Sequence, residues 1–172
     1  QMQMVDVDML VPEDHLLRKV DRVIDFERVY DFVEKYYCPD NGRPAVDPVV
    51  LVKMVLIQHL FGIPSLRRTV EEINVNVAYR WFLGFDLMTT VPHFSTVSYA
   101  FATRFPSEVC EQVFAWILEE AVNRGCIDTS TVFIDATHVK ANANRKKFIK
   151  EQAKKAARIY DEQLREEIDQ DR

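Results

Sequence analysis

Apolar residues return at intervals of three and four positions over most of the chain, which is the spacing of one face of a helix. Only four glycines interrupt this pattern, and there is no internal repeat or low-complexity linker. The pattern predicts a mainly α-helical protein. The expected helices cover residues 13–24, 26–37, 48–61, 66–73 and 77–83. A further helix is expected to begin between residues 92 and 95 and to end at about 105. The last begins at 106 and ends at Gly125, a C-cap.

The most apolar of these helices covers residues 48–61. Asp47 is a suitable N-cap, and Pro48 fits the first helical position. Because apolar residues cover this helix nearly all round, we expect it at the centre of the fold. The stretch is too short and too polar to span a bilayer, since it contains Lys53, Gln58 and His59.

The pattern changes after residue 128. Residues 131–135 are β-branched or aromatic apart from Asp135, and turn-forming residues precede them, which predicts a strand. From Arg145 to about residue 169 the chain becomes a charged helix. Its pairs at i and i+4 mix like charges with unlike charges. We expect this helix to be solvated and weakly anchored.

Charge is distributed unevenly along the chain. The formal net charge is -5 and the sequence pI is about 5.4, so the protein as a whole is not basic. Residues 1–42 are rich in Asp and Glu, whereas eight Lys and Arg residues between 140 and 158 are opposed only by Glu151. The overall acidity therefore does not exclude a nucleic-acid partner.

Other features of the sequence point to a cytoplasmic protein. The three cysteines are widely spaced and form no C-x-x-C pair, so we expect reduced, buried thiols rather than disulfides or a zinc site. No signal peptide opens the chain, and residue 1 is Gln, which suggests that the natural start is missing. We expect a protein without a membrane partner.

Asp135 is the first candidate for chemistry. A carboxylate at the end of a buried strand is costly unless a cation pairs with it. In two-metal phosphoryl-transfer sites an Asp at such a position holds Mg²⁺ beside other carboxylates. The alternative is a strand-end Asp that caps a turn. His138 follows closely and is a structural residue, a phosphate contact or a metal ligand. Lys140 is either a phosphate contact or a solvated lysine.

The chain resembles the InsH-like group of DDE transposases of bacterial insertion sequences over nearly its whole length. Each matching segment is weak alone, but the four occur in the family's order and approximate spacing. They are Gly42-Arg-Pro-Ala-Val-Asp-Pro48, Asn76-Val-Ala-Tyr-Arg-Trp-Phe-Leu-Gly84, Val91-Pro-His-Phe-Ser-Thr96 and Phe133-Ile-Asp-Ala-Thr-His-Val-Lys-Ala-Asn142. His93 stands where many relatives have Asp, and Ala136 is a minor variation.

The resemblance implies a helical domain over residues 1–128, followed over 129–172 by the first strand and an inserted helix of an incomplete RNase H-like domain. It also implies that Asp135 is the first acidic residue of a Mg²⁺-binding triad. The second Asp and the Glu of that triad lie far downstream in intact relatives, so we expect this chain alone to be inactive. The intact enzyme would bind the terminal inverted repeats of its element, then cut and join DNA strands. The resemblance thus implies a bacterial, nucleoid-associated protein.

Two groups of basic residues are candidates for DNA contact. Arg67, Arg68 and Arg80 lie beside the short break at residues 74–76, and they suit either backbone contact or ordinary helix packing. The second group lies in the basic segment and consists of Lys140, Arg145, Lys146, Lys147, Lys150 and Lys154. The Ser95-Thr96 helix start is a further phosphate candidate.

Aromatic residues and the wider function leave alternatives open. Trp81, Phe82 and Phe85 are core residues or base-stacking residues, with core the more usual reading for a helical cluster. Besides a transposase fragment, the sequence fits a DNA-binding or homodimerising module that represses its element. It also fits a helical interaction domain with no DNA role.

Overall fold

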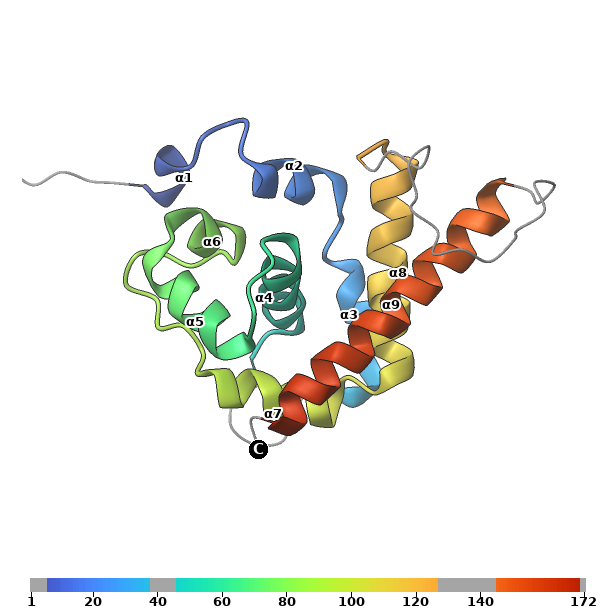
Figure 1. The fold of residues 1–172 in the computed structure, drawn as a ribbon. Coiled ribbons are helices and arrows are strands. Elements are labelled where there is room, and N and C mark those ends of the chain that lie inside the picture. Colours follow the sequence, from blue (N-terminus) through green and yellow to red (C-terminus); the bar gives the residue numbers. More distant parts are fainter. Residues whose placement is uncertain (1–5, 38–45, 127–144, 171–172) are drawn as a thin grey trace, which may run out of the picture.

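The computed structural model describes residues 6–37, 46–126 and 145–170, and every regular element in these ranges is a helix (Figure 1). The elements are α1 Val7–Leu10, α2 Leu16–Val23, α3 Arg28–Val33, the 3₁₀ helix η1 Glu34–Tyr36, α4 Pro48–Leu60, α5 Leu66–Val75, α6 Val77–Phe82, α7 Phe94–Arg104, α8 Ser107–Asn123 and α9 Arg145–Gln170. The mainly α-helical class predicted from the sequence is confirmed. The predicted strand at 131–135, with Asp135, His138 and Lys140, lies outside the described residues.

The first two helices are shorter than the apolar pattern predicts. The helix expected over 13–24 begins only at Leu16, because the His15 side chain accepts a hydrogen bond from the Leu17 N–H and acts as the N-cap. The helix expected over 26–37 divides into α3 and the 3₁₀ turn η1. Periodicity locates the apolar face but does not fix the helix ends, which depend on these local hydrogen bonds.

The centre of the fold is α4, as the sequence predicts. The Asp47 carboxylate accepts from the Val49 N–H at 2.8 Å and caps the helix. Leu51, Val52, Met54, Val55 and Ile57 have no exposed surface. In Figure 1, α5 and α6 lie on one side of α4, and α3 and α8 lie on the other. No described helix combines the length and the hydropathy that a membrane crossing requires.

Helix α9 corrects one expectation from the sequence. It lies across α8 and also contacts α7, so it is anchored rather than weakly attached (Figure 1). Its buried stripe consists of Ala153, Ala157, Asp161, Leu164 and Ile168. These residues follow one another at intervals of four and three, but they are few and one is charged. Because charged residues dominate the sequence of this helix, its pattern did not reveal the buried face.

The division into two domains, residues 1–128 and 129–172, stays a prediction. Helix α9, which falls in the second range, packs against helices of the first, and its Leu164 and Ile168 belong to the same hydrophobic core as α4 and α8. The described part of residues 129–172 therefore shares its core with the N-terminal helices.

Candidate nucleic-acid interface

The predicted basic segment contributes its described side chains to the N-terminal half of α9. Lys150, Lys154 and Lys155 are exposed, and none of them has an ion-pair partner among the described residues. We call these three residues the basic surface of α9. Ala153 and Ala157 on the same half of the helix are buried. Arg145, Lys146 and Lys147 form the first turn of α9, but their side chains, like Lys140, lie outside the described part.

The next basic residue of the segment already has a partner. Arg158 Nε lies 3.0 Å from the Glu111 carboxylate of α8, in an ion pair that is partly exposed. Glu111 offsets the charge of Arg158, so Arg158 adds less to the basic character of this helix than the unpaired lysines do. The basic surface of α9 is therefore confined to the first half of the helix.

The second half of α9 carries the opposite charge. Its acidic residues are Asp161, Glu162, Glu166, Glu167 and Asp169, and Arg165 is the one basic residue among them. A polyanion such as DNA would be repelled by this half and attracted by the other. The charge order therefore limits a DNA contact to the part of α9 that lies farthest from α4 and α5 (Figure 1).

Two of the three predicted arginines near the break between α5 and α6 lie at the surface. Arg68 forms exposed ion pairs with Glu71 at 3.0 Å and with Glu72 at 2.7 Å. Arg67 is exposed, and its guanidinium lies 4.2 Å from the centre of the Phe94 ring. Because the two glutamates offset the charge of Arg68, this face of α5 attracts phosphate less than the basic surface of α9 does.

Arg80 does not lie at the surface, contrary to its assignment as a DNA contact. Its side chain is buried, with 5% of its surface exposed. The guanidinium donates to the carbonyl of Asp86 at 3.0 and 2.6 Å and to the carbonyl of Thr89. Arg80 thus holds the turn after α6 by satisfying two carbonyl groups that have no helical partner. The sequence pattern, an arginine next to a helix break, fits a DNA contact, but the hydrogen-bond partners of this arginine lie within the protein.

The aromatic residues beside Arg80 support the core interpretation. Phe82 is 1% exposed and packs edge-on against Phe26. The Trp81 indole N–H donates to the Asp8 carboxylate at 2.7 Å, and the Arg18 guanidinium lies 4.5 Å from the centre of the Trp81 ring. The hydrogen bonds from Arg18 and Trp81 hold the pKa of the Asp8 carboxyl below its usual range. Trp81 is therefore engaged by α1 and α2.

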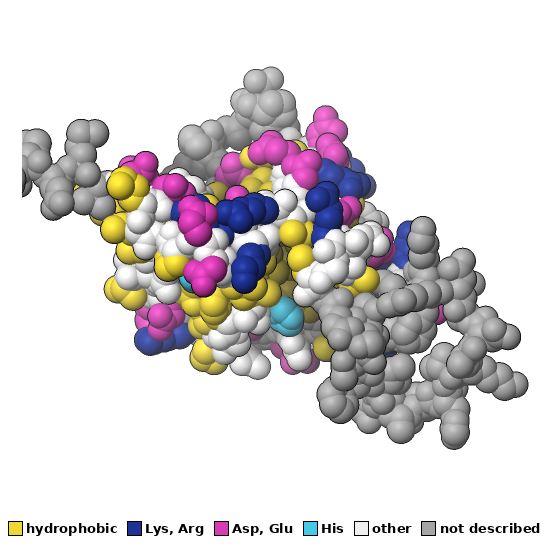
Figure 2. All heavy atoms as spheres, turned by 90° about the horizontal axis from the view of Figure 1, so that it is seen from above, with side chains coloured by type: hydrophobic (Ala, Val, Ile, Leu, Met, Phe, Trp, Pro, Cys, Tyr) yellow, Lys and Arg dark blue, Asp and Glu magenta, His cyan; other side chains and the backbone are white. Residues whose placement is uncertain are grey.

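The face formed by α1 and α2 is not basic. Figure 2 views the molecule from above and shows Lys and Arg side chains intermixed with Asp and Glu. Arg22 pairs with Glu13 at 2.9 Å, and Lys53 pairs with Asp21 at 2.8 Å. Mutually neutralised charges of this kind give little attraction for a polyanion.

The start of α7 is the remaining phosphate candidate. His93 is the N-cap, since its Nδ1 accepts from the Ser95 N–H at 3.3 Å and lies 2.7 Å from the Ser95 hydroxyl. Ser95 and Thr96 are exposed, as a phosphate contact would require. The His93 ring already occupies one of the free N–H groups, so the helix start offers fewer donors than the sequence suggests.

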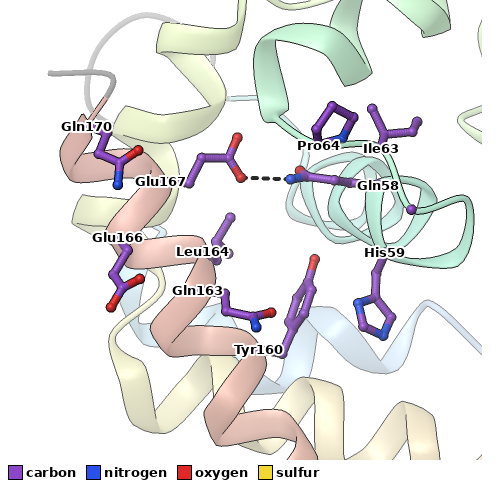
Figure 3. Close-up of a pocket in the computed structure, with 11 residues that line it drawn as sticks. Gln58, His59, Ile63, Pro64, Tyr160, Gln163, Leu164, Glu166, Glu167 and Gln170 are labelled. Atoms are coloured by element: carbon purple, nitrogen blue, oxygen red, sulfur yellow. Dashed lines mark hydrogen bonds between the residues drawn. The ribbon is translucent and has the colours of Figure 1, made fainter.

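A cavity of about 430 Å³, which the sequence analysis did not predict, lies between the end of α4 and α9 (Figure 3). It is lined by Gln58, His59, Gly62, Ile63, Pro64, Tyr160, Gln163, Leu164, Glu166, Glu167 and Gln170. Burial lowers the pKa of the His59 imidazole, which favours its neutral form. With Glu166 and Glu167 in its wall, the cavity does not suit a phosphate. Its two walls lie about a hundred residues apart in the sequence, which is why local patterns cannot reveal it.

A metal site is not formed by the described residues. They contain no group of three or more His, Cys, Asp or Glu side chains placed to hold a metal ion. Asp135, the predicted Mg²⁺ ligand, belongs to the residues that are not described.

The free thiols in the described part are the buried Cys110 and the exposed Cys126, and burial raises the pKa of the Cys110 thiol.

Comparison with known families identifies the helical part of the chain. The family model described as Transposase domain (DUF772) matches residues 5–103, which span α1 to α6 and nearly all of α7. No curated protein and no solved structure matches the chain. The family match covers more than half of the 172 residues, with α4 at the centre of the matched region. The chain therefore belongs to the transposase domain family.

Proposed function

We propose that this chain is the N-terminal part of an InsH-like DDE transposase and that it binds duplex DNA through the basic surface of α9. The family match over residues 5–103 supports a transposase. The resemblance of residues 133–142 to the segment that bears the first acidic residue of the triad supports the specific group.

The DNA contact is proposed for Lys150, Lys154 and Lys155 because they combine exposure with the lack of an ion-pair partner in the described structure. Their ammonium groups would neutralise phosphates along one strand and release condensed counterions. Each such contact changes the slope of log affinity against log salt by roughly -0.9. Three contacts would therefore contribute a slope of about -2.7, enough to make binding strongly dependent on salt.

The chemistry of the intact family member is proposed to depend on Asp135. Mg²⁺ held by Asp135, a second Asp and a Glu would activate water and a 3′-hydroxyl at the terminal inverted repeats. The resemblance places the second Asp and the Glu far downstream in intact relatives. The activity proposed for this chain by itself is therefore DNA binding, without strand cleavage.

The test is a titration of a labelled duplex with three proteins at salt concentrations of about 50 and 200 mM. The first is the wild type, and the second carries Lys150→Gln, Lys154→Gln and Lys155→Gln. The third is a control with Lys19→Gln, Arg22→Gln and Lys35→Gln, exposed residues of α2 and η1. Both triple variants remove three positive charges, so they differ only in where the charge is lost.

We expect the wild type and the control to bind weakly and without sequence preference, with Kd values of about 10⁻⁴–10⁻⁶ M. The α9 variant should bind more weakly at low salt and show a flatter salt dependence. Equal affinity of the α9 variant and the wild type would remove the basic surface of α9 as the DNA contact. A loss shared equally by the two triple variants would show that only net charge matters.

A further inference from the structure

Helix α9 is tied to the N-terminal helices by three side chains of its second half, and each of them bonds to the backbone of a different helix. Glu167 accepts from the Leu66 N–H at the start of α5 and from the Gln58 side chain at 2.7 Å. Arg165 donates to the Phe105 carbonyl at the end of α7, at 2.8 Å. Tyr160 donates its hydroxyl proton to the Val55 carbonyl of α4, at 2.9 Å.

The charges of these contacts match the ends of the helices that they touch. The first N–H groups of α5 carry partial positive charge, and the carboxylate of Glu167 complements them. Phe105 is the C-cap residue of α7, next to the helix end that carries partial negative charge, and the guanidinium of Arg165 complements that end. Ser65 caps a different N–H group of α5, that of Arg68, so Glu167 adds to the cap and does not duplicate it. Figure 3 shows Glu167 reaching from α9 to Gln58.

These contacts allow only one register of α9. The distances along α9 between Tyr160, Arg165 and Glu167 correspond to fixed distances between α4, α7 and α5 in the core. Ala153 and Ala157 are the small residues of the buried stripe, and sliding the helix by a turn would bring larger residues against α8. Arg165 also holds the buried Asp161 carboxylate at 2.9 Å, and this pair would lose its place in any other register.

The register has a consequence for the residues between α8 and α9. Helix α8 ends at Asn123 and α9 begins at Arg145, so the two helices flank the stretch that contains Asp135. Both helices pack on the same core and on each other (Figure 1). Helices α8 and α9, which precede and follow that stretch in the sequence, are therefore held at fixed positions on the core.

We infer that Glu167 and Arg165 are positioning residues, which set the register of α9 and thereby the point at which the chain enters α9 after the Asp135 stretch. Their relevance for catalysis rests on the proposed function, because only there is Asp135 a metal ligand. The mechanical part of the inference concerns the free chain and does not depend on DNA or Mg²⁺.

Hydrogen exchange of the full chain, measured by mass spectrometry without DNA or metal, tests this inference. The variants are Glu167→Ala, Glu167→Gln and Arg165→Met, with Glu166→Ala as the control. Glu166 is exposed, neighbours Glu167 and has no hydrogen-bond partner among the described residues. Glu167→Gln keeps an oxygen that can accept from the Leu66 N–H, so it is the conservative variant.

We expect Glu167→Ala to speed exchange in the first turn of α5 by about five- to tenfold, as loss of a helix cap does. Exchange should also rise by about two- to fivefold at residues 150–155, several turns away along α9, because the register of the whole helix loosens. Glu167→Gln should restore most of the protection at both places. Arg165→Met should act at the end of α7 and at residues 150–155, and Glu166→Ala should leave exchange unchanged.

Faster exchange confined to the first turn of α5 would overturn the inference, since Glu167 would then be a local cap only. The same applies if Glu166→Ala matches Glu167→Ala, or if no variant changes exchange. Should Glu167→Ala unfold the chain, the comparison of Glu167→Gln with Arg165→Met at residues 150–155 decides the matter alone. Equal DNA affinity of the α9 lysine variant and the wild type would refute the proposed DNA contact and leave this result untouched.

Discussion

Leu164 is the place to test whether α9 belongs to the folded core. Its side chain is 3% exposed and lies in the same apolar cluster as Leu51 of α4 and Val113 of α8. Changing Leu164 to Ala removes buried methyl and methylene groups and leaves a cavity, because the backbone of α9 is held by its polar contacts. Changes of this type lower the free energy of unfolding by about 2–5 kcal/mol. For a chain of this size that corresponds to a fall in Tm of roughly 4–20 °C.

Ile159 provides the matched control, since it lies on the same helix and is 48% exposed. Ile159→Ala should change the free energy of unfolding by less than about 0.5 kcal/mol. Urea denaturation followed by circular dichroism gives both values, and a fall in midpoint without a change in slope identifies a pure stability effect. If Leu164→Ala costs no more than Ile159→Ala, α9 is not docked in solution, and the register argument fails with it.

Three further outcomes follow from individual contacts. Arg80→Ala should lower the free energy of unfolding by about 2–4 kcal/mol, because two carbonyls lose a charged donor. Arg68→Ala should lower it by less than about 1 kcal/mol, because the ion pairs of Arg68 are exposed, and thermal denaturation compares the two variants. Burial, with a hydrogen bond to Asp47, raises the pKa of Tyr30 to about 12. Because an unfolded Tyr ionises near pH 10, stability should fall as pH rises from about 10 to about 12, and Tyr30→Phe should show a smaller fall in pH-dependent melting curves. Incubated with Mg²⁺ and duplex DNA, the chain should leave the strands intact on a denaturing gel; cleavage that Asp135→Ala abolishes would contradict this.

The helical architecture was predictable where one residue type carries a local signal. Asp47 and Pro48 mark the start of α4, and Ser65 and Asn76 cap α5 and α6 at positions where the sequence places a start or a break. The burial of α4 followed from its apolar residues all round, since such a helix is stable only inside a core. These features depend on neighbours within a few positions, which is the range over which sequence patterns are informative.

Features that depend on distant residues were not predictable. Arg80 and Arg68 look alike in sequence, and only the fold brings the Asp86 carbonyl to the first and leaves the second at the surface. The docking of α9 depends on Glu167 meeting Leu66, about a hundred positions earlier in the chain. No local property distinguishes Glu167 from the exposed Glu166 beside it. Candidate charged residues can therefore be collected from the sequence, but their division into internal and surface roles requires the structure.

The order of charges along α9 explains why the helix has two different kinds of partner. Lysines lie in its first half and carboxylates in its second, which opposes the helix dipole and weakens the helix in isolation. Docking relieves the conflict at one end only, because Glu167 and Arg165 find oppositely charged helix ends in the core. At the other end, the positive side chains add to the partial positive charge of the helix start, and the described residues offer Lys150, Lys154 and Lys155 no anion. An external polyanion would compensate the positive charge at this end, as α5 and α7 compensate the charges of Glu167 and Arg165 at the acidic end. This is the physical basis for proposing DNA as the partner.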